Sequence, residues 1–225
     1  MGKLSEILLR QENVKVIPPE IEMDVYVPLD LSAATTDLIQ LPLTDVHLFE
    51  DFIENYLSEN EAKVAYGGYL EHRNLYQRSS VFKDANVEER NIHIGIDLWI
   101  KAGTTVVAAL DGTIHSFQNN TALGDYGPAI ILKHEIETET FYTLYGHLSL
   151  ESLAGKAEGQ KVSQGEVIGH LGSAPINGDY APHLHFQIIK DLQGKKGDYP
   201  GVCAKSEVEY YKENCPDPNL LLKIK

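Results

Sequence analysis

Three short stretches of the sequence combine histidine with neighbours that could build a metal centre or a proton-transfer site. In residues 92–100 the aliphatic residues occupy the even positions, so a strand would bury them on one face. His93, Gly95, Asp97 and Trp99 would then share the other face. The Cα atoms of His93 and Asp97 would lie about 13 Å apart on a straight strand, a gap that two converging side chains barely span. Gly95 leaves room for an ion and permits a kink that brings the two side chains closer.

The other two stretches add three histidines. In residues 182–187 the same alternation directs His183 and His185 to one face of a strand and buries the apolar residues beside them. Residues 142–148 form an apolar strand that ends in a glycine followed by His147. A single histidine at a strand end is weak evidence for catalysis. His147 becomes a candidate site residue only together with the other two stretches.

In this order and spacing, the three motifs resemble the signature of the lysostaphin-type zinc metallopeptidases. That signature is His-x-x-x-Asp, a strand ending in Tyr-Gly-His-Leu, and His-Leu-His-Phe, and the likeness covers residues 91–190 with their glycine-rich hairpins. The resemblance implies two sets of site residues, namely the metal ligands His93, Asp97 and His185, and the catalytic His147 and His183.

The chemistry of the implied ligands independently agrees with a catalytic zinc site. Two imidazoles and one carboxylate are common ligands of catalytic zinc and leave the fourth position for water. Zinc lowers the pKa of such a water and polarises the carbonyl of the substrate. The chain has no His-Glu-x-x-His motif to supply a glutamate base. His147 and His183 would therefore divide proton transfer and oxyanion stabilisation, and the sequence leaves open which does which.

The sequence departs from the family pattern at a few positions. Gln187 stands where many members have glutamate, and residues 177–181 replace the usual turn; neither is expected to touch a ligand. Residues 66–82 resemble a subgroup of these domains that is also found inside large aminotransferase-containing proteins. Surface or local hydrogen-bonding roles are expected for the remaining histidines, which are His47, His72, His115, His134 and His170.

Charge and hydropathy limit the partners. The chain has 19 basic and 33 acidic residues, a net charge of −14, which repels nucleic-acid phosphates and anionic lipids. No apolar run reaches the roughly 20 residues of a membrane-spanning helix. Residues 1–22 lack the features of an export signal, so a cytoplasmic location is expected. Cys203 and Cys215 do not have the spacing of a redox or zinc motif and are interpreted as free or structural thiols.

The sequence pattern of the 225 residues divides the chain into three parts. Residues 1–90 are expected to be an N-terminal extension with one amphipathic helix over 44–61, capped by Thr44, and one strand over 23–31. Residues 91–190 would form the zinc metallopeptidase-like β domain, and residues 191–225 a tail that packs on it.

The fold expected for the central part is mainly β. Its strand runs are short and separated by glycine turns. Gly103-Thr-Thr-Val106 is echoed by Gly159-Gln-Lys-Val162, and each is followed by further glycines. This repetition predicts an antiparallel sandwich or barrel of duplicated hairpins.

Three functions fit these observations. The first is a zinc metalloendopeptidase that hydrolyses short peptide bonds of the peptidoglycan cross-bridge type, or those of a related cytoplasmic peptide. The second is a zinc-binding scaffold of the same fold without turnover, against which the presence of all five site residues argues. The third is a histidine phosphocarrier, which Asp97 disfavours because a carboxylate suits a cation and repels a phosphoryl group.

Overall fold

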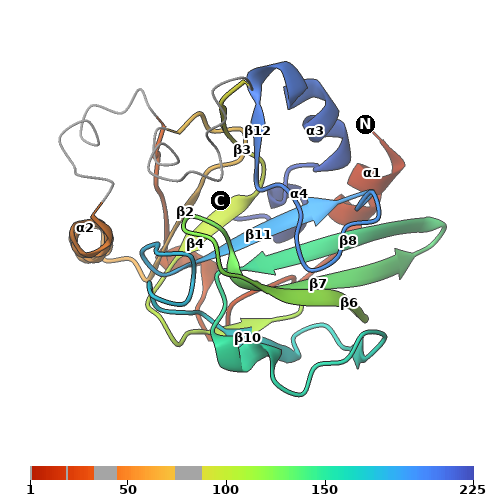
Figure 1. Cartoon of the computed structure of the whole chain (residues 1–225), viewed down its shortest axis with the longest axis horizontal. Coiled ribbons are helices and arrows are strands. Elements are labelled where there is room, and N and C mark those ends of the chain that lie inside the picture. The colour runs from red at the N-terminus through yellow and green to blue at the C-terminus, as the bar shows by residue number, and fades with distance from the viewer. Residues whose placement is uncertain (1, 19, 33–44, 74–87) are drawn as a thin grey trace.

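The computed structural model describes residues 2–18, 20–32, 45–73 and 88–225. An open sheet with the order β1-β2-β4-β11-β8-β7-β6-β9 runs through the molecule (Figure 1). Its strands, in sheet order, are β1 (Tyr26–Pro28), β2 (Val64–Gly67), β4 (Ile96–Trp99), β11 (His183–Ile189), β8 (Glu139–Gly146), β7 (Gly127–Ile136), β6 (Gly112–Asn120) and β9 (Lys161–Val162). Two small antiparallel sheets pair β5 (Thr105–Val107) with β10 (Val167–His170), and β3 (Arg90–His93) with β12 (Val202–Ala204).

The prediction of a mainly β fold is confirmed, and the large sheet does not close into a barrel. Its strands pair antiparallel except for β1 and β2, which run parallel. The two segments that echo each other in the sequence lead into β5 and β9, which belong to different sheets. Strands β1 and β9 are left as the two edges.

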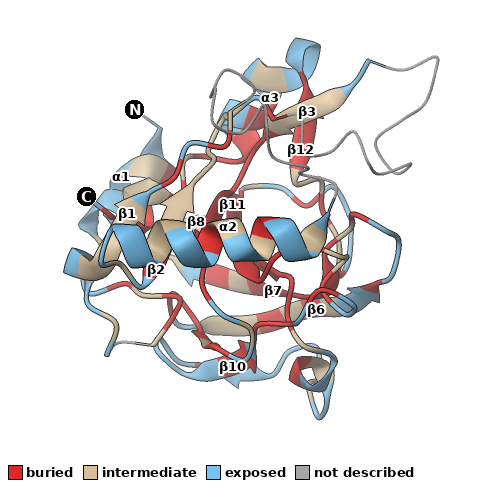
Figure 2. Cartoon of the chain, turned by 90° about the vertical axis from the view of Figure 1, so that its left-hand side faces the viewer, coloured by how far each residue is buried: buried red, intermediate tan, exposed pale blue. Residues whose placement is uncertain are grey.

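Apolar side chains cover both faces of the central strands β7, β8 and β11. Ile130 and Phe186 belong to one buried cluster, whereas Ile131 and Leu144 belong to another that also contains Tyr199 from the C-terminal part. A strand that is buried on both faces reads as a continuous apolar run, as residues 129–132 do. Burial is concentrated in these central strands, while the helices expose one side (Figure 2).

The helices are α1 (Lys3–Arg10), α2 (Val46–Glu59), α3 (Val208–Asn214) and α4 (Asn219–Leu222), with short 3-10 turns η1 (Met23–Val25), η5 (Leu150–Leu153) and η6 (Lys205–Glu207). The helix α2 was predicted, but its N-cap is Asp45, whose carboxylate accepts hydrogen bonds from the backbone of His47 and Leu48 at 3.0 and 3.2 Å. Thr44 lies outside the described residues. Helix α1 was not predicted, although its apolar face is buried. The single strand expected over 23–31 is a 3-10 turn followed by the three-residue β1.

Residues of the N-terminal extension join the sheet that carries the site. Strand β2 pairs with β4, and β1 pairs with β2, so the extension continues the large sheet beyond β4. Helix α2 lies across this side of the molecule (Figure 2), and its Phe49 packs edge-on against Trp99 at 5.3 Å between ring centroids. The division into three parts at residues 90 and 190 stays a prediction. Within the described ranges, no helix has both the length and the apolar character that a bilayer span requires.

Cys203 and Cys215 are free and fully buried. Burial raises the pKa of Cys203 to about 11 and that of Cys215 to about 12. Both thiols therefore stay protonated at neutral pH, which agrees with a structural role.

His134 is buried in the sheet and makes two hydrogen bonds there. Its Nδ1–H donates to the carbonyl of Asp111 at 2.8 Å, and its Nε2 lies 2.7 Å from Oγ1 of Thr143. Burial lowers the pKa of this imidazole from 6.5 to about 4, against a smaller opposing effect of Asp111. Between these two values the unfolded chain binds one proton more than the folded one. His134 therefore favours folding fully above pH 6.5, and this contribution is lost as the pH falls toward 4.

We expect His134→Gln to flatten the pH dependence of the free energy of unfolding between the two pKa values. One titrating group fewer removes up to about 1.4 kcal/mol per pH unit from the slope. Urea unfolding at a series of pH values measures this slope. His170→Gln, which changes an exposed histidine, is the matched control. Equal slopes in wild type and His134→Gln would show that His134 does not titrate in this way.

Candidate active site

Strand order brings the three histidine motifs together. Strand β11 lies between β4 and β8, and its His185 stands opposite Asp97 on one side and Gly146 on the other. His183 lies two residues earlier on the same strand face. His147 directly follows β8, so it lies next to this pair. All five residues predicted from the sequence meet at one place.

His93 reaches the site through a break in the chain at Gly95. Strand β3 ends at His93, and β4 begins at Ile96 in the other sheet. This break is the kink expected from the sequence. A Cβ atom on residue 95 would lie 2.5 Å from Cε1 of His185, so only glycine lets the strand approach the imidazole this closely.

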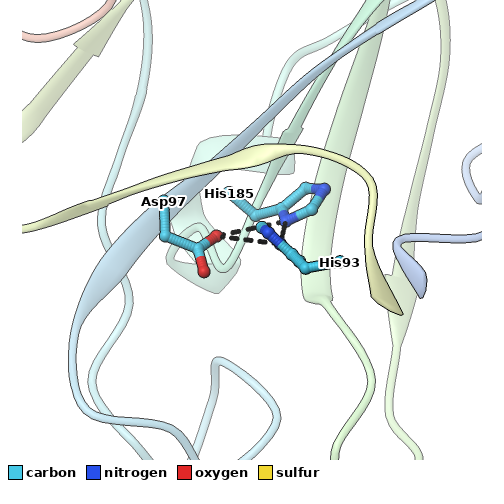
Figure 3. A group of neighbouring side chains, drawn as sticks. All are labelled: His93, Asp97 and His185. Carbon is cyan, nitrogen blue, oxygen red and sulfur yellow. Dashed lines mark hydrogen bonds and ion pairs between the residues drawn. The ribbon is translucent and has the colours of Figure 1, made fainter. Parts of the chain in front are cut away.

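Three donor atoms converge at the centre of the site (Figure 3). Nε2 of His93 lies 2.9 Å from Nδ1 of His185, and Oδ1 of Asp97 lies 3.3 and 3.2 Å from these two nitrogens. Tetrahedral zinc with bonds of about 2.0–2.1 Å separates neighbouring ligand atoms by roughly 3.3 Å. The donor types and their spacing therefore fit one zinc ion.

Hydrogen bonds set the tautomers of the two imidazoles in this group, His93 and His185. Nδ1–H of His93 donates to the carbonyl of Gly68 at 2.9 Å, which leaves the lone pair on Nε2. Nε2–H of His185 donates to Oε1 of Gln187 at 2.9 Å, which leaves the lone pair on Nδ1. The amide of Gln187 is itself oriented, because its nitrogen donates to the carbonyl of Pro200 at 3.1 Å. Partners of this kind commonly hold the histidine ligands of zinc in position.

The expectation that Gln187 touches no ligand is thus wrong. Its side chain is fully buried and lies on the same strand face as His183 and His185. The alternation that pointed to those two histidines extends to Gln187 two residues later, and this signal could have found it.

The remaining two histidines are neighbours, with ring centroids 4.2 Å apart. Nδ1–H of His147 donates to the carbonyl of Asn177 at 2.6 Å, and Nδ1–H of His183 donates to that of Ala181 at 2.8 Å. Residues 177–181 therefore position both imidazoles, although they touch no metal ligand there. In each ring Nε2 is left as the free acceptor. His147 has a φ of 62°, in the left-handed region that residues with a Cβ seldom adopt.

Burial disfavours the protonated form of three imidazoles in the site. It is the main cause that lowers the pKa of His93 and of His183 to about 4 and that of His147 well below its usual value. For Asp97, burial acts to raise the pKa, but electrostatic interactions with the neighbouring His93, Arg73 and His183 outweigh it and hold the pKa well below its usual range. Neutral imidazoles and an ionised carboxylate are the forms that bind a metal.

The site opens into a cavity of about 160 Å³. Its wall includes aromatic rings and charges of both signs, among them Trp99, Tyr126, Tyr180, Arg90, Asp125, Lys195 and Asp198. The ring of Trp99 stacks on that of His183 at 4.0 Å and 27°. Because Phe49 of α2 packs on Trp99, the extension supports this wall of the site.

Sequence reasoning missed several residues of the site. None of the five histidines assigned surface or local roles lines the cavity, as expected. Arg73 and Tyr126 line it and were given no role. Trp99 also lines it, on the strand face where the alternation placed it with His93 and Asp97. Arg73 lies outside residues 91–190, and its place in the site depends on a tertiary contact.

Comparison with known proteins finds a family match for the part of the chain that carries most of the site. Residues 91–198 match the model of peptidase family M23. This part of the chain has the mainly β fold and the convergent histidine and aspartate residues expected from the resemblance. The family match and the site residues thus agree with the resemblance to the lysostaphin-type metallopeptidases.

Two of the similar proteins are longer than this chain. A DD-carboxypeptidase/endopeptidase, Mpg, of Neisseria meningitidis is 42% identical over 96 residues, which cover 43% of this chain and 20% of that protein. Stage II sporulation protein Q of Bacillus subtilis is 33% identical over 99 residues, 43% of this chain and 32% of that protein. The catalytic domain of lysostaphin from Staphylococcus simulans is 23% identical, with 72% of this chain and 97% of that domain covered and a TM-score of 0.40. The chain therefore spans about a fifth of the length of the first of these relatives.

Proposed function

We propose that the protein is a zinc metallopeptidase in which His93, Asp97 and His185 hold one Zn²⁺. The observation that carries the proposal is the spacing of their three donor atoms, 2.9 to 3.3 Å, at the ligand separation of a tetrahedral zinc site. The tautomers of both imidazoles, set by Gly68 and Gln187, leave the lone pairs on the facing nitrogens.

His147 and His183 are proposed as the catalytic residues. The bound zinc would supply an acidified water and polarise the scissile carbonyl. Both Nε2 atoms are acceptors in the resting site, because both Nδ1–H groups are already bonded to carbonyls. The imidazole that accepts a proton at Nε2 becomes a cation and a donor there. One of the two could thus take the proton from the zinc-bound water, and the ring that has taken it could then donate from its protonated Nε2 to the oxyanion.

The proposed substrates are short peptide bonds of the peptidoglycan cross-bridge type, or those of a related cytoplasmic peptide. The names of two relatives support the first class. They are the Neisseria protein above and a peptidoglycan DD-endopeptidase, ShyC, of Vibrio cholerae, which is 32% identical over 98 residues. A cavity with both acidic and basic residues suits a peptide that carries charges of both signs. The cytoplasmic location and the absence of nucleic-acid and membrane partners stay predictions.

One relative supports a second candidate function, a zinc-binding scaffold without turnover. The Bacillus subtilis relative, stage II sporulation protein Q, is named for sporulation. The orientation of His147 and His183 argues against a scaffold. Both rings are held with Nε2 as an acceptor, an arrangement that a scaffold without turnover does not need. The phosphocarrier is disfavoured further, because the ionised Asp97 occupies the place where a phosphoryl group would sit beside His183.

The function is tested on the purified chain by metal analysis and by hydrolysis of a peptide panel. We expect about one zinc per chain, removed by a chelator and regained on dialysis against Zn²⁺. The panel contains glycine-rich peptides, peptides with D-amino acids and soluble peptidoglycan fragments, and mass spectrometry identifies the bond that is cut. Tight zinc binding with no cleavage across the panel would favour the scaffold. A chain that regains no zinc would refute the metal site itself.

A further inference from the structure

The second carboxylate oxygen of Asp97 is held by an arginine from outside the matched region. Oδ1 of Asp97 faces the two imidazole ligands, whereas Oδ2 accepts a hydrogen bond from Nη1 of Arg73 at 2.5 Å. The two oxygens of this carboxylate are therefore turned in different directions. Only one of them points at the place that a metal would occupy (Figure 3).

Arg73 is itself held in place. Its side chain is 1% exposed, and its Nε donates to the carboxylate of Glu71, whose other oxygen accepts from the backbone N–H of Leu31 at 2.9 Å. The backbone around it is bonded to β3, with Arg73 N–H donating to Asn91 at 2.8 Å and His93 N–H donating to Glu71 at 2.9 Å. The guanidinium thus has a defined direction relative to the ligands.

We propose that Arg73 is a positioning residue that holds Asp97 as a one-oxygen metal ligand. The inference rests on the zinc site of the proposed function. A buried carboxylate without a partner on Oδ2 could turn and offer both oxygens to the ion, and zinc readily accepts a fifth ligand atom. By occupying Oδ2, Arg73 keeps the remaining coordination position open for water.

The positive charge of Arg73 alone would lower the affinity of the site for Zn²⁺, since a nearby cation repels the metal ion. Glu71 offsets this effect, because its carboxylate is paired with the same guanidinium. The pair of Glu71 and Arg73 brings nearly no net charge to the site. The remaining effect of Arg73 is its hydrogen bond to Asp97, whose direction is fixed. The planar guanidinium holds its N–H groups in a fixed geometry, which a lysine ammonium does not.

The same short segment also orients a second ligand. The carbonyl of Gly68 accepts from His93, and Arg73 donates to Asp97, so residues 68–73 contact two of the three ligands. Residues 91–198 match the family model, and this segment precedes them. The metal site of this chain therefore includes a part of its extension.

The test compares Arg73→Met with wild type in metal binding, without reference to turnover. We expect zinc affinity, measured by competition with a chromophoric chelator, to fall about 10- to 100-fold, the usual cost of removing a partner of a metal ligand. In the Co²⁺-substituted protein the visible absorption should weaken, because a five-coordinate site absorbs less strongly than a tetrahedral one. Arg73→Lys, which keeps the charge and one donor, should recover part of the lost affinity.

Two further variants serve as controls for Arg73→Met. His72→Ala changes the exposed neighbour and should bind zinc and Co²⁺ as wild type does. Glu71→Gln with Arg73→Met removes both partners of the buried pair, so no buried charge is left without a counterion if the single variant folds poorly. If folded Arg73→Met or the double variant keeps the zinc affinity and the Co²⁺ spectrum of wild type, the positioning role is refuted while the zinc site stands. If wild type itself binds no zinc, the proposed function fails, and the role of Arg73 with it.

Discussion

Replacing His93, Asp97 or His185 with alanine is expected to lower zinc affinity by orders of magnitude and to abolish hydrolysis. Each change leaves two protein ligands, and two donors of a tetrahedral site seldom hold zinc against a chelator. The three donor atoms lie 2.9 to 3.3 Å apart, so no other described side chain is needed to complete the set. Competition with a chelator of known affinity measures the loss.

Folding has to be separated from metal binding in this experiment. The three ligands are almost fully buried, and the loss of a buried side chain can itself destabilise the chain. Circular dichroism with and without zinc shows whether each variant keeps its sheet. His170→Ala removes an exposed histidine outside the site and should bind zinc as wild type does. Wild-type affinity in a folded His185→Ala would show that the metal site lies elsewhere.

Replacing His147 or His183 is expected to leave the zinc in place and to lower kcat by about a hundredfold or more, the usual cost of a lost proton acceptor or oxyanion donor. Neither imidazole belongs to the set of three converging donors. His183 is the more demanding case, because its Nε2 lies 3.8 Å from Oδ1 of Asp97. Zinc content and hydrolysis are therefore measured on the same preparations.

The choice of substitution follows from the surroundings of each ring. His147 has a left-handed backbone, so His147→Asn, which tolerates this conformation, is preferred to alanine. His183 stacks on Trp99 at 4.0 Å, and His183→Gln preserves more of that packing than alanine does. If His183→Gln loses its zinc while His185→Ala keeps it, the assignment within this pair is reversed. If both catalytic variants hydrolyse peptides at the wild-type rate, the chemistry is carried by other groups.

The pattern of the sequence predicted local geometry well. A strand has a period of two, so the alternation in residues 92–100 and 182–187 determines which side chains share a face. The break at Gly95 and the burial of Leu98 and Leu184 on the opposite face follow from this alternation and agree with the structure. Element boundaries in the extension were less predictable, since short amphipathic segments such as α1 owe their stability to packing rather than to local signals.

Alternation along single strands could not place one strand beside another. Tertiary pairing places β11 between β4 and β8 and sets His185 opposite Asp97 and Gly146. A register shift by one residue would turn every side chain of the strand to the other face. The buried contacts that orient the ligands have the same origin. Arg73 lies 24 residues from Asp97 in the chain, and no local pattern links them.

The sequence by itself therefore predicted a set of candidate metal ligands and the strand faces that carry them, and it determined that the fold is mainly β. These are properties of residue type and of a period of two, and both are local. Only the tertiary structure decided that the five residues meet, that Gln187 and Arg73 are hydrogen-bonded to His185 and Asp97, and that α2 and β2 of the extension border the site. Each of these depends on burial and hydrogen bonding between segments far apart in the chain, where the free energy comes from the packing of the whole domain.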